Sequence, residues 1–116
     1  MMLKRILVFN STRDWGQFHN PKDVAISLAL EASEVLEHFQ WKNPQEIKQH
    51  LKGNKAEVAE EIVDVLYWVL LLSHYLKIDL NEAFDKKMLQ NERKYPVAKA
   101  KGSHKKYTHY QKKNVT

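Results

Sequence analysis

Apolar residues along the chain recur with the 3.6-residue period of an α-helix rather than the two-residue period of a strand. The longest such segment covers residues 54–77, and shorter ones cover about residues 21–39 and 79–95. The expected core stripe of the long segment is Val58, Ile62, Val65, Leu66 and Val69. No stretch alternates with period two for long enough to make a convincing strand. The pattern therefore predicts an all-α fold.

Three capping signals mark where these helices begin. Residues 20–23 (NPKD) and 43–46 (NPQE) each place an N-cap, a proline at the first helical position and an acid in the first turn. Residues 79–82 (DLNE) have the sequence of a capping box. Gly53 is expected to end the short helix that opens at residue 43, and Pro96 to stop the last helix.

The two ends of the chain are less regular. Residues 1–9 are apolar and fit a helix or a strand by pattern alone, and we favour a first helix. The formal net charge of +5 is unevenly divided: residues 1–92 hold 11 Lys and Arg and all 14 acids, which leaves −3, whereas residues 93–116 hold 8 basic residues and no acid. We therefore expect a four- to five-helix bundle in residues 1–96, followed by a flexible basic tail in residues 97–116.

Composition excludes several classes of protein. The chain has 116 residues, which suits one domain, and it has no cysteine, which excludes a disulfide framework and a thiolate zinc site. The apolar run of residues 65–72 is far shorter than the ~20 residues that span a membrane. No signal peptide is recognisable at the N-terminus. We expect a cytoplasmic protein that does not bind membranes.

Two pairs of acids lie inside the apolar segments. Glu31 and Glu34 are three residues apart in residues 28–41, and Glu61 and Asp64 repeat this spacing. Residues three apart share one face of a helix, so each pair points one way. If the two helices pack together, the four carboxylates form a cluster that is costly without a cation. Hard oxygen ligands and no cysteine favour Mg²⁺, or Mn²⁺.

These acids have other possible interpretations: a solvated helix face, a structural protein without a site, or a di-iron centre. The ordinary one is a solvated helix face, or a structural helical protein with no site at all, but no basic residue lies within one turn of Glu31 or Glu34. A carboxylate-bridged di-iron bundle requires Glu-x-x-His on two helices, and no glutamate here has His three residues later. Magnesium with a phosphate ligand is the reading that remains.

The last helix offers candidate phosphate ligands. Lys87, Asn91, Lys94 and Tyr95 fall at positions i, i+4, i+7 and i+8 and therefore share one face. Taken singly, each is an ordinary residue of a solvated helix. As a set opposite four acids, they suit a triphosphate.

Several segments together resemble the MazG-like all-α nucleotide pyrophosphohydrolases, and most closely their dCTP pyrophosphatase branch. The matching segments are RDWGQFHNPK (13–22), LALEASEVLEHFQW (28–41), EEIVDVLYW (60–68), DLNEAFDKKMLQNERKYP (79–96) and KKYT (105–108). Enzymes of this family cleave a nucleoside triphosphate between the α and β phosphates, giving the monophosphate and pyrophosphate. The resemblance therefore implies a nucleotide hydrolase.

The resemblance also implies roles for individual residues. It makes Glu31, Glu34, Glu61 and Asp64 the Mg²⁺ ligands. The residues expected to bind substrate are Trp15, His19, Trp41, Lys87, Asn91 and Tyr95. We expect Glu34 to orient or deprotonate the attacking water and Lys87 to stabilise the pyrophosphate leaving group. The first helix matches the family poorly, and Leu89 and Trp68 stand where an acid and a tyrosine are expected.

Substrate choice follows from the aromatic residues in this reading. Trp15 and Trp41, at opposite ends of the first site helix, are expected to form a narrow slot for a pyrimidine, with dCTP or a modified dCTP preferred. Such an enzyme would remove unwanted nucleotides from the pool. The slot must read the base edge through a polar group, for which His19 and Asn91 are candidates, because stacking alone does not distinguish bases.

The partners expected are a nucleoside triphosphate and further copies of this chain. The long helix is apolar nearly all round from residue 65 to residue 72, which favours a dimer or tetramer with a site completed across subunits. The alternative is a helical module that binds nucleic acid through the basic tail. We expect the tail to be a flexible, solubilising segment instead.

Overall fold

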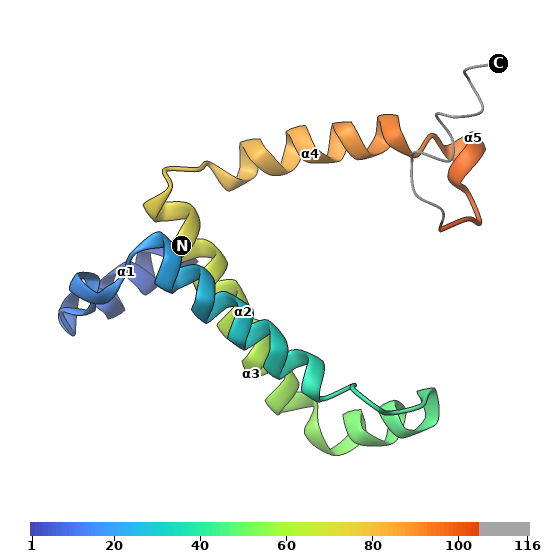
Figure 1. The fold of residues 1–116 in the computed structure, drawn as a ribbon, viewed down its shortest axis with the longest axis horizontal. Helices are drawn as coiled ribbons and strands as arrows, with labels where there is room; N and C mark the ends of the chain where they lie inside the picture. Colours follow the sequence, from blue (N-terminus) through green and yellow to red (C-terminus); the bar gives the residue numbers. More distant parts are fainter. Residues whose placement is uncertain (105–116) are drawn as a thin grey trace. The chain divides into compact units, whose positions relative to one another are not determined.

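A computed structural model describes residues 1–104 of the chain (Figure 1). Its elements are α1 (Met2–Thr12), the 3₁₀ turn η1 (Trp15–Phe18), α2 (Pro21–Glu37), α3 (Pro44–Tyr75), α4 (Leu80–Lys94) and α5 (Val97–Ala100). Residues 1–104 contain no strand, so the all-α prediction is confirmed, as is the helix favoured for residues 1–9. None of the helices in this range is long and apolar enough to cross a membrane.

The chain divides into two compact units, residues 1–78 and residues 79–116. In the first unit, α2 and α3 run antiparallel and side by side, and α1 packs against α3 (Figure 1). The second unit contains α4 and the short helix α5. Helix α5 lies within the segment predicted to be a tail, and the KKYT segment of residues 105–108 lies outside the described residues.

The predicted capping residues begin their helices. The Asn20 side chain accepts a hydrogen bond from the Asp23 N–H at 2.9 Å at the start of α2. Asn43 and Glu46 form a complete capping box at α3, with N···O distances of 2.9 and 3.2 Å. Asp79 makes only half of the box predicted at α4: it accepts from the Glu82 N–H at 3.2 Å, while the Glu82 carboxylate pairs with Lys86 at 3.1 Å.

The helix break predicted at Gly53 lies one residue later, at Asn54. Helix α3 consists of two helical segments joined at a kink there, because the Asn54 φ of −127° and ψ of 15° are not helical. The Asn54 side-chain Nδ2 donates to the His50 carbonyl at 2.9 Å. In a regular helix this carbonyl accepts the backbone N–H of residue 54. A side chain that inserts into the hydrogen-bond ladder bends a helix without ending it.

Helix α3 ends in a Schellman motif rather than by unwinding. Lys77 adopts a left-handed φ of 56°. The Ile78 N–H then donates to the Ser73 carbonyl at 2.9 Å, and the Lys77 N–H donates to the His74 carbonyl at 3.1 Å. These two bonds satisfy carbonyls that a helix C-terminus leaves free. Lysine here replaces the glycine that is usual at this position, at some cost in backbone strain.

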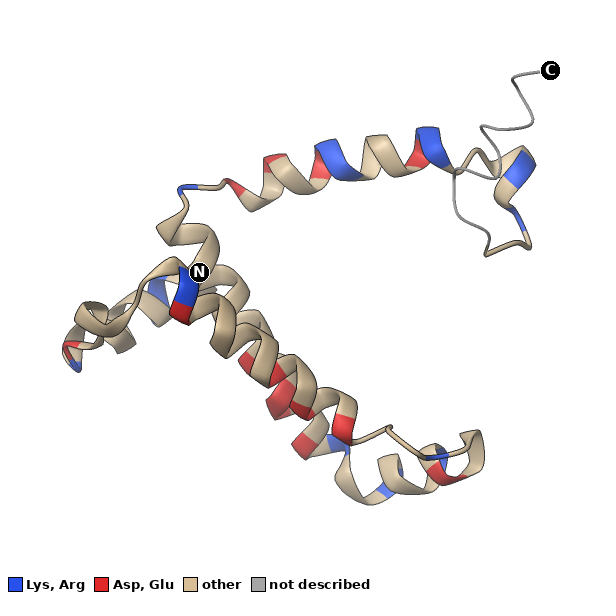
Figure 2. Cartoon of the chain, viewed as in Figure 1, with Lys and Arg blue, Asp and Glu red and all other residues tan. Residues whose placement is uncertain are grey.

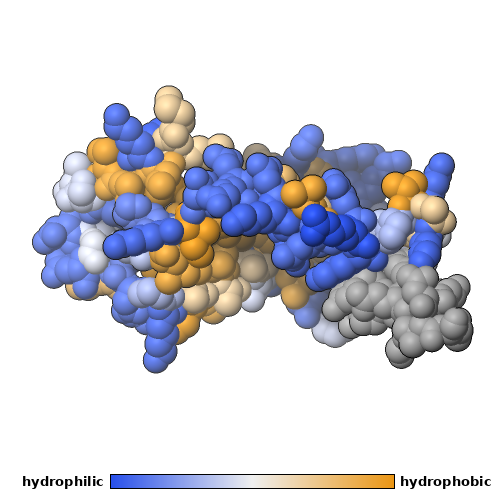
Figure 3. Space-filling model, turned by 90° about the horizontal axis from the view of Figure 1, so that it is seen from above, coloured by the Kyte–Doolittle hydropathy of each residue, from blue (hydrophilic) through white to orange (hydrophobic). Residues whose placement is uncertain are grey.

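The buried apolar core of the single chain is small. Among the described residues, only Val24, Val58 and Leu71 are fully buried hydrophobic residues. Of the stripe predicted on the long helix, Ile62 is 53% exposed and Leu66 is 38% exposed, so both are wrong as core residues of one chain. Figure 3 shows apolar side chains reaching the surface between charged ones. A surface this apolar is typical of a chain that associates.

Candidate metal and nucleotide site

The four predicted metal-binding acids lie on the two helices that pack side by side. Glu31 and Glu34 project from α2, and Glu61 and Asp64 from α3; the acidic bands of both helices gather in Figure 2. The negative charges of Glu34, Asp64 and Glu61 all act on the Glu31 carboxyl group. The antiparallel packing of α2 on α3 therefore forms one cluster from two pairs that are thirty residues apart in the sequence.

The Glu31 carboxyl group is the most strongly perturbed member of the cluster. Burial raises its pKa above the usual value of 4.5, and a hydrogen bond to Glu34 and the neighbouring carboxylate charges raise it further. Its Oε2 atom is buried and has no hydrogen-bond partner. Both observations describe a carboxyl group for which the protein supplies no compensating positive charge.

Glu61 has a similar unsatisfied oxygen, although a histidine lies close to it. The His38 Nε2 atom is 2.5 Å from Glu61 Oε2. The contact is too bent to be a hydrogen bond, so this buried Oε2 has no hydrogen-bond partner. A small rotation of the carboxylate would align the two groups into a hydrogen bond. His38 was not predicted as a site residue, yet it lies four residues after Glu34 and seven after Glu31, on the same face of α2.

The acids do not form a preassembled ligand set. In residues 1–104, no three His, Asp or Glu side chains converge as a group that could hold a metal ion. The donor chemistry nevertheless fits a hard divalent cation, because the cluster contains only carboxylates and two of their oxygens are buried and unpaired. Side-chain rotations within the cluster would be needed to bring the oxygens onto one ion.

A pocket of about 580 Å³ opens beside the acids. Its wall comes from α1, α2, α3 and η1 and is mostly apolar and aromatic, with Phe9, Trp15, Tyr67 and Trp68 among its lining residues. Glu31 and Asp64 supply its acidic groups. A pocket of this size and lining, with a few polar groups on one side, is typical of small-molecule sites.

One aromatic contact and one hydrogen bond hold the α1 and η1 side of this pocket. Trp15 packs edge-to-face on Phe9, with ring centroids 5.4 Å apart. The Tyr67 hydroxyl donates to Asn10 Oδ1 at 2.6 Å and thereby joins α3 to α1. Burial raises the pKa of Tyr67, which keeps this hydroxyl protonated as a donor. Tyr67 and Asn10 were not predicted to contribute, since a tyrosine in an apolar helix reads as core.

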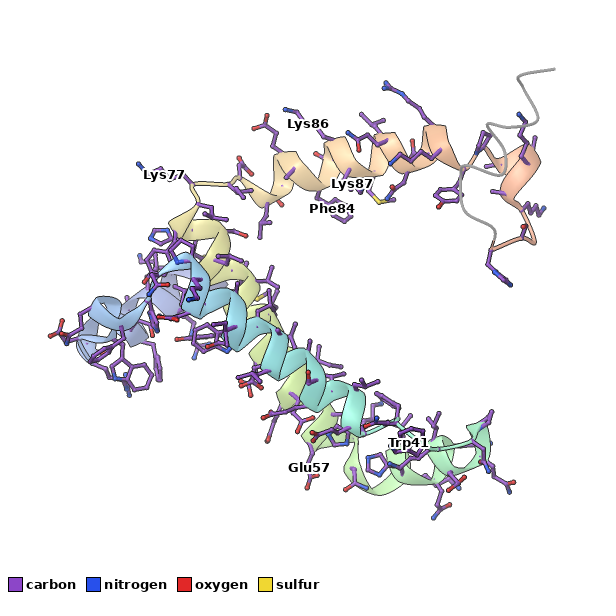
Figure 4. All side chains as sticks on the ribbon, viewed as in Figure 1. Trp41, Glu57, Lys77, Phe84, Lys86 and Lys87 are labelled. Atoms are coloured by element: carbon purple, nitrogen blue, oxygen red, sulfur yellow. The ribbon has the colours of Figure 1, made fainter. Side chains whose placement is uncertain are left out.

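The structure does not bring Trp15 and Trp41 of one chain together, and the slot predicted between two such rings stays a prediction. Trp15 lines the pocket, but Trp41 does not: it is 91% exposed, with a left-handed φ of 66°, in the connection between α2 and α3 (Figure 4). The two residues flank the 17-residue helix α2, which is about 25 Å long at 1.5 Å per residue. This separation is too large for one base to contact both rings.

His19 lies one ring away from the pocket. It packs edge-to-face on Trp68 with centroids 5.8 Å apart, and its Nδ1 atom is 3.3 Å from the Tyr75 hydroxyl oxygen. Trp68 in turn lines the pocket. His19 therefore contacts Trp68 without lining the pocket itself, and it can orient the Trp68 ring.

The remaining predicted substrate ligands belong to the second unit. Lys87, Asn91 and Tyr95 lie on or at the end of α4, and the Tyr95 N–H donates to the Asn91 carbonyl at 2.9 Å. Lys86, the neighbour of Lys87, projects from the side of α4 opposite to Phe84 (Figure 4). That Lys87, Asn91 and Tyr95 contact a phosphate or sugar beside the acids stays a prediction.

Comparisons with known proteins show the family of this chain. The chain is 37% identical over 102 residues to the dCTP pyrophosphatase 1 of Bos taurus and to that of Homo sapiens. The match covers 86% of this chain but only 60% of those relatives. It also resembles the crystal structure of a pyrophosphatase from Archaeoglobus fulgidus, with 42% identity and a TM-score of 0.77, over 82% of this chain and 89% of that one. A model of the MazG-like family matches residues 26–109, and the chain belongs to this family.

Proposed function

We propose that this protein is a Mg²⁺-dependent nucleoside triphosphate pyrophosphohydrolase that acts on dCTP or a modified dCTP. The observation that carries the proposal is the cluster of four carboxylates beside an aromatic pocket, in which the Glu31 Oε2 atom is buried and unpaired. Such a cluster favours a bound cation, and a nucleotide brings its phosphates to such a cation. The names of the relatives point to the same substrate.

Four acids of this chain would hold the metal: Glu31, Glu34, Glu61 and Asp64. When bound, Mg²⁺ supplies charge neutralisation at the triphosphate and lowers the pKa of a water ligand. Glu34 is the exposed member of the α2 pair, so it can face solvent and orient or deprotonate the attacking water. The water attacks the α-phosphorus, the bond from that phosphorus to the bridging oxygen breaks, and pyrophosphate leaves. Lys87 would stabilise the charge on pyrophosphate.

The pocket lined by Trp15, Phe9 and Trp68 would receive the base and sugar. Its aromatic walls provide stacking, worth ~1–3 kcal/mol per base. His19 would hold Trp68 in place, and Asn91 and Tyr95 would approach the nucleotide from the second unit. Trp41 would act outside the pocket formed by its own α1, η1 and α3, for example on a nucleotide held by another copy.

We further propose that the enzyme is a dimer or tetramer of this chain. Support comes from the small buried core and from apolar side chains that remain exposed on both units, among them Ile62, Leu66 and Phe84. Obligate homo-oligomers have interfaces of this apolar kind. Association would also allow α4 of one copy to serve the carboxylates of another.

A panel of nucleoside triphosphates tests the proposed function. The assay measures pyrophosphate release at saturating Mg²⁺, with EDTA as the control. We expect dCTP and its 5-substituted forms to have the highest kcat/KM, and EDTA to abolish release. No release from any triphosphate would refute the activity, whereas purine triphosphates turned over as well as dCTP would refute only the base preference.

A further inference from the structure

Three polar side chains outside the carboxylate cluster contact one another in series, and the last of them contacts Glu61 of the cluster. We propose that Asn54, His50 and His38 are a hydrogen-bond relay of fixed direction that positions Glu61 for metal binding. The relay rests on the metal site of the proposed function, but its direction is a property of this chain alone. It runs from the kink of α3 to the C-cap of α2 and back to α3.

The first step fixes the orientation of the Asn54 amide. Its Nδ2 atom lies 2.9 Å from the His50 carbonyl oxygen and 3.3 Å from His50 Nδ1. A carbonyl oxygen can only accept, so the amide must present its NH₂ group on this side. The second N–H of that group then faces His50 Nδ1, which must be the unprotonated, accepting nitrogen. The proton of a neutral His50 ring is therefore on Nε2.

The second step passes this direction to His38. His50 Nε2 is 2.8 Å from His38 Nδ1, and only one proton fits between the two atoms. Because His50 Nε2 is the donor, His38 Nδ1 is the acceptor and the His38 proton lies on Nε2. That atom is 2.5 Å from Glu61 Oε2. Asn54 at the kink thus fixes the tautomer of His38 that presents an N–H group, and not a lone pair, to Glu61.

The consequence for Glu61 is a carboxylate held by one oxygen. Once a small rotation of the carboxylate aligns the two groups, a neutral N–H donor at Oε2 fixes the rotation of the carboxylate without removing its negative charge, so Oε1 stays available to an ion. Partners that hydrogen-bond a metal-binding side chain orient it in this way, and their loss typically costs ~10–100-fold in metal affinity. His38 and His50 are half-buried, so the relay is partly protected from competing water.

Metal binding by matched variants tests the positioning role. The Mg²⁺ and Mn²⁺ dissociation constants of the nucleotide-free protein are measured by titration calorimetry. We expect His38→Leu to raise the dissociation constant ~10–100-fold, and His38→Gln, which keeps an N–H near the position of Nε2, to recover most of the loss. His74→Gln, a change at an exposed histidine near the end of α3, is the control and should leave the constant unchanged. Wild-type affinity in a folded His38→Leu variant would overturn the proposal.

The direction of the relay has a readout that needs no metal. Nitrogen-15 NMR of the imidazoles should show both His38 and His50 protonated at Nε2, and Asn54→Leu should release His50 to a mixture of tautomers. A proton on Nδ1 of either ring in the wild type would overturn the direction. If His38→Leu does not fold, His50→Leu against His50→Gln repeats the metal comparison one step further out.

The outcomes separate this proposal from the proposed function. A protein that binds Mg²⁺, loses affinity in His38→Leu and yet hydrolyses no triphosphate would refute the activity and keep the relay. If the protein hydrolyses dCTP and its metal affinity is unchanged in every relay variant, the relay is refuted and the proposed activity is kept. A wild-type protein that binds no divalent ion would refute both.

Discussion

At the scale of single residues, the buried, unpaired Oε2 atom of Glu31 is the clearest mark of a candidate site. A carboxylate oxygen left without a partner inside a cluster of acids is unfavourable unless a ligand compensates it. The members with greater exposure, Glu34 and Asp64, complete the cluster at its solvent side. This division suggests that removing charge from the exposed members affects turnover more than folding.

We expect Glu34→Gln and Asp64→Asn to abolish turnover without loss of stability. A residue that transfers a proton in the reaction contributes ~10²–10⁴-fold to the rate, so we expect at least this fall in kcat for Glu34→Gln. Removing one charge from a cluster of like charges relieves repulsion, and the metal-free melting temperature should stay constant or rise. Steady-state kinetics and thermal melts measure the two effects.

Glu57→Gln is the matched control for these two variants. Glu57 is an exposed acid one turn before Glu61 on the same helix (Figure 4). We expect its turnover to equal that of the wild type. Near-normal turnover in Glu34→Gln or Asp64→Asn at saturating Mg²⁺ would instead show that the metal assignment is wrong.

The raised pKa of Glu31 predicts an unusual pH dependence of stability. The folded protein holds this proton more tightly than the unfolded chain, whose Glu31 titrates near 4.5. The stabilising contribution is therefore fully present below pH 4.5 and is lost as the pH rises through the raised pKa. In metal-free buffer, the melting temperature of the wild type relative to Glu31→Gln should fall over this range.

Added Mg²⁺ should reverse that fall, because the ion binds the deprotonated carboxylate and only in the folded state. The measurement is a series of thermal melts from pH 4.5 upward, with EDTA or with Mg²⁺. Parallel curves for the wild type and Glu31→Gln in EDTA would contradict the assignment of a perturbed Glu31.

The acid pairs could be predicted from sequence, but the histidines that support them could not be predicted fully. The spacing of residues 31, 34 and 38 places His38 on the acidic face of α2, so its position was readable. Its partner His50 depends on the α2–α3 connection and on the kink at Asn54. Neither feature has a local sequence signal strong enough to place two rings 2.8 Å apart.

At the scale of helices, starts and breaks were both predicted from local signals. The start of α3 has a local cause, because Asn43 and Glu46 satisfy each other's backbone N–H groups. The break predicted at Gly53 lies one residue later: Gly53 does not have the positive φ that a terminating glycine adopts, and the non-helical backbone falls on Asn54.

Gly53→Ala should therefore stabilise the protein by about 0.5–1 kcal/mol, because alanine restricts the unfolded chain more and fits helical backbone. No atom lies within 4 Å of a Cβ at this position. The free energy of unfolding, from urea denaturation, measures the effect. Gly102→Ala is the contrasting control: Gly102 has a φ of 79°, so the same change there should not stabilise. A destabilised Gly53→Ala would mean that residue 53 ends a helix after all.

At the scale of the whole molecule, no pattern in the sequence relates α4 to the carboxylates. Helix α4 belongs to a separate unit from the four acids. The spacing of its polar residues is the same whether they contact the acids of their own chain or those of another copy. The amphipathic pattern predicted that apolar faces would be covered, but it did not say by which surface. This is why the core residues Ile62 and Leu66 were assigned to the wrong environment.

Mixing two inactive variants tests whether the site is shared between copies. Glu34→Gln removes the carboxylate that we propose to orient the water, and Lys87→Ala removes the cation that we propose to stabilise the leaving group. If α4 of one copy serves the acids of another, co-refolded mixtures should regain part of the wild-type turnover, because some sites then combine two intact halves. The activity of the mixture is compared with that of each variant alone. Mixtures as inactive as their components would show that each site is built from one chain.

The small core described for the single chain has a consequence for how the protein exists in dilute solution. With Val24, Val58 and Leu71 as the buried hydrophobic residues of the part described, the single chain leaves many large apolar side chains exposed, which association with other copies would bury. Under the association that we propose, folding then obeys mass action: the fraction of native protein depends on total concentration as well as on temperature. Dilution below the dissociation constant would remove structure and catalysis together, so cellular abundance itself would set how much enzyme is present.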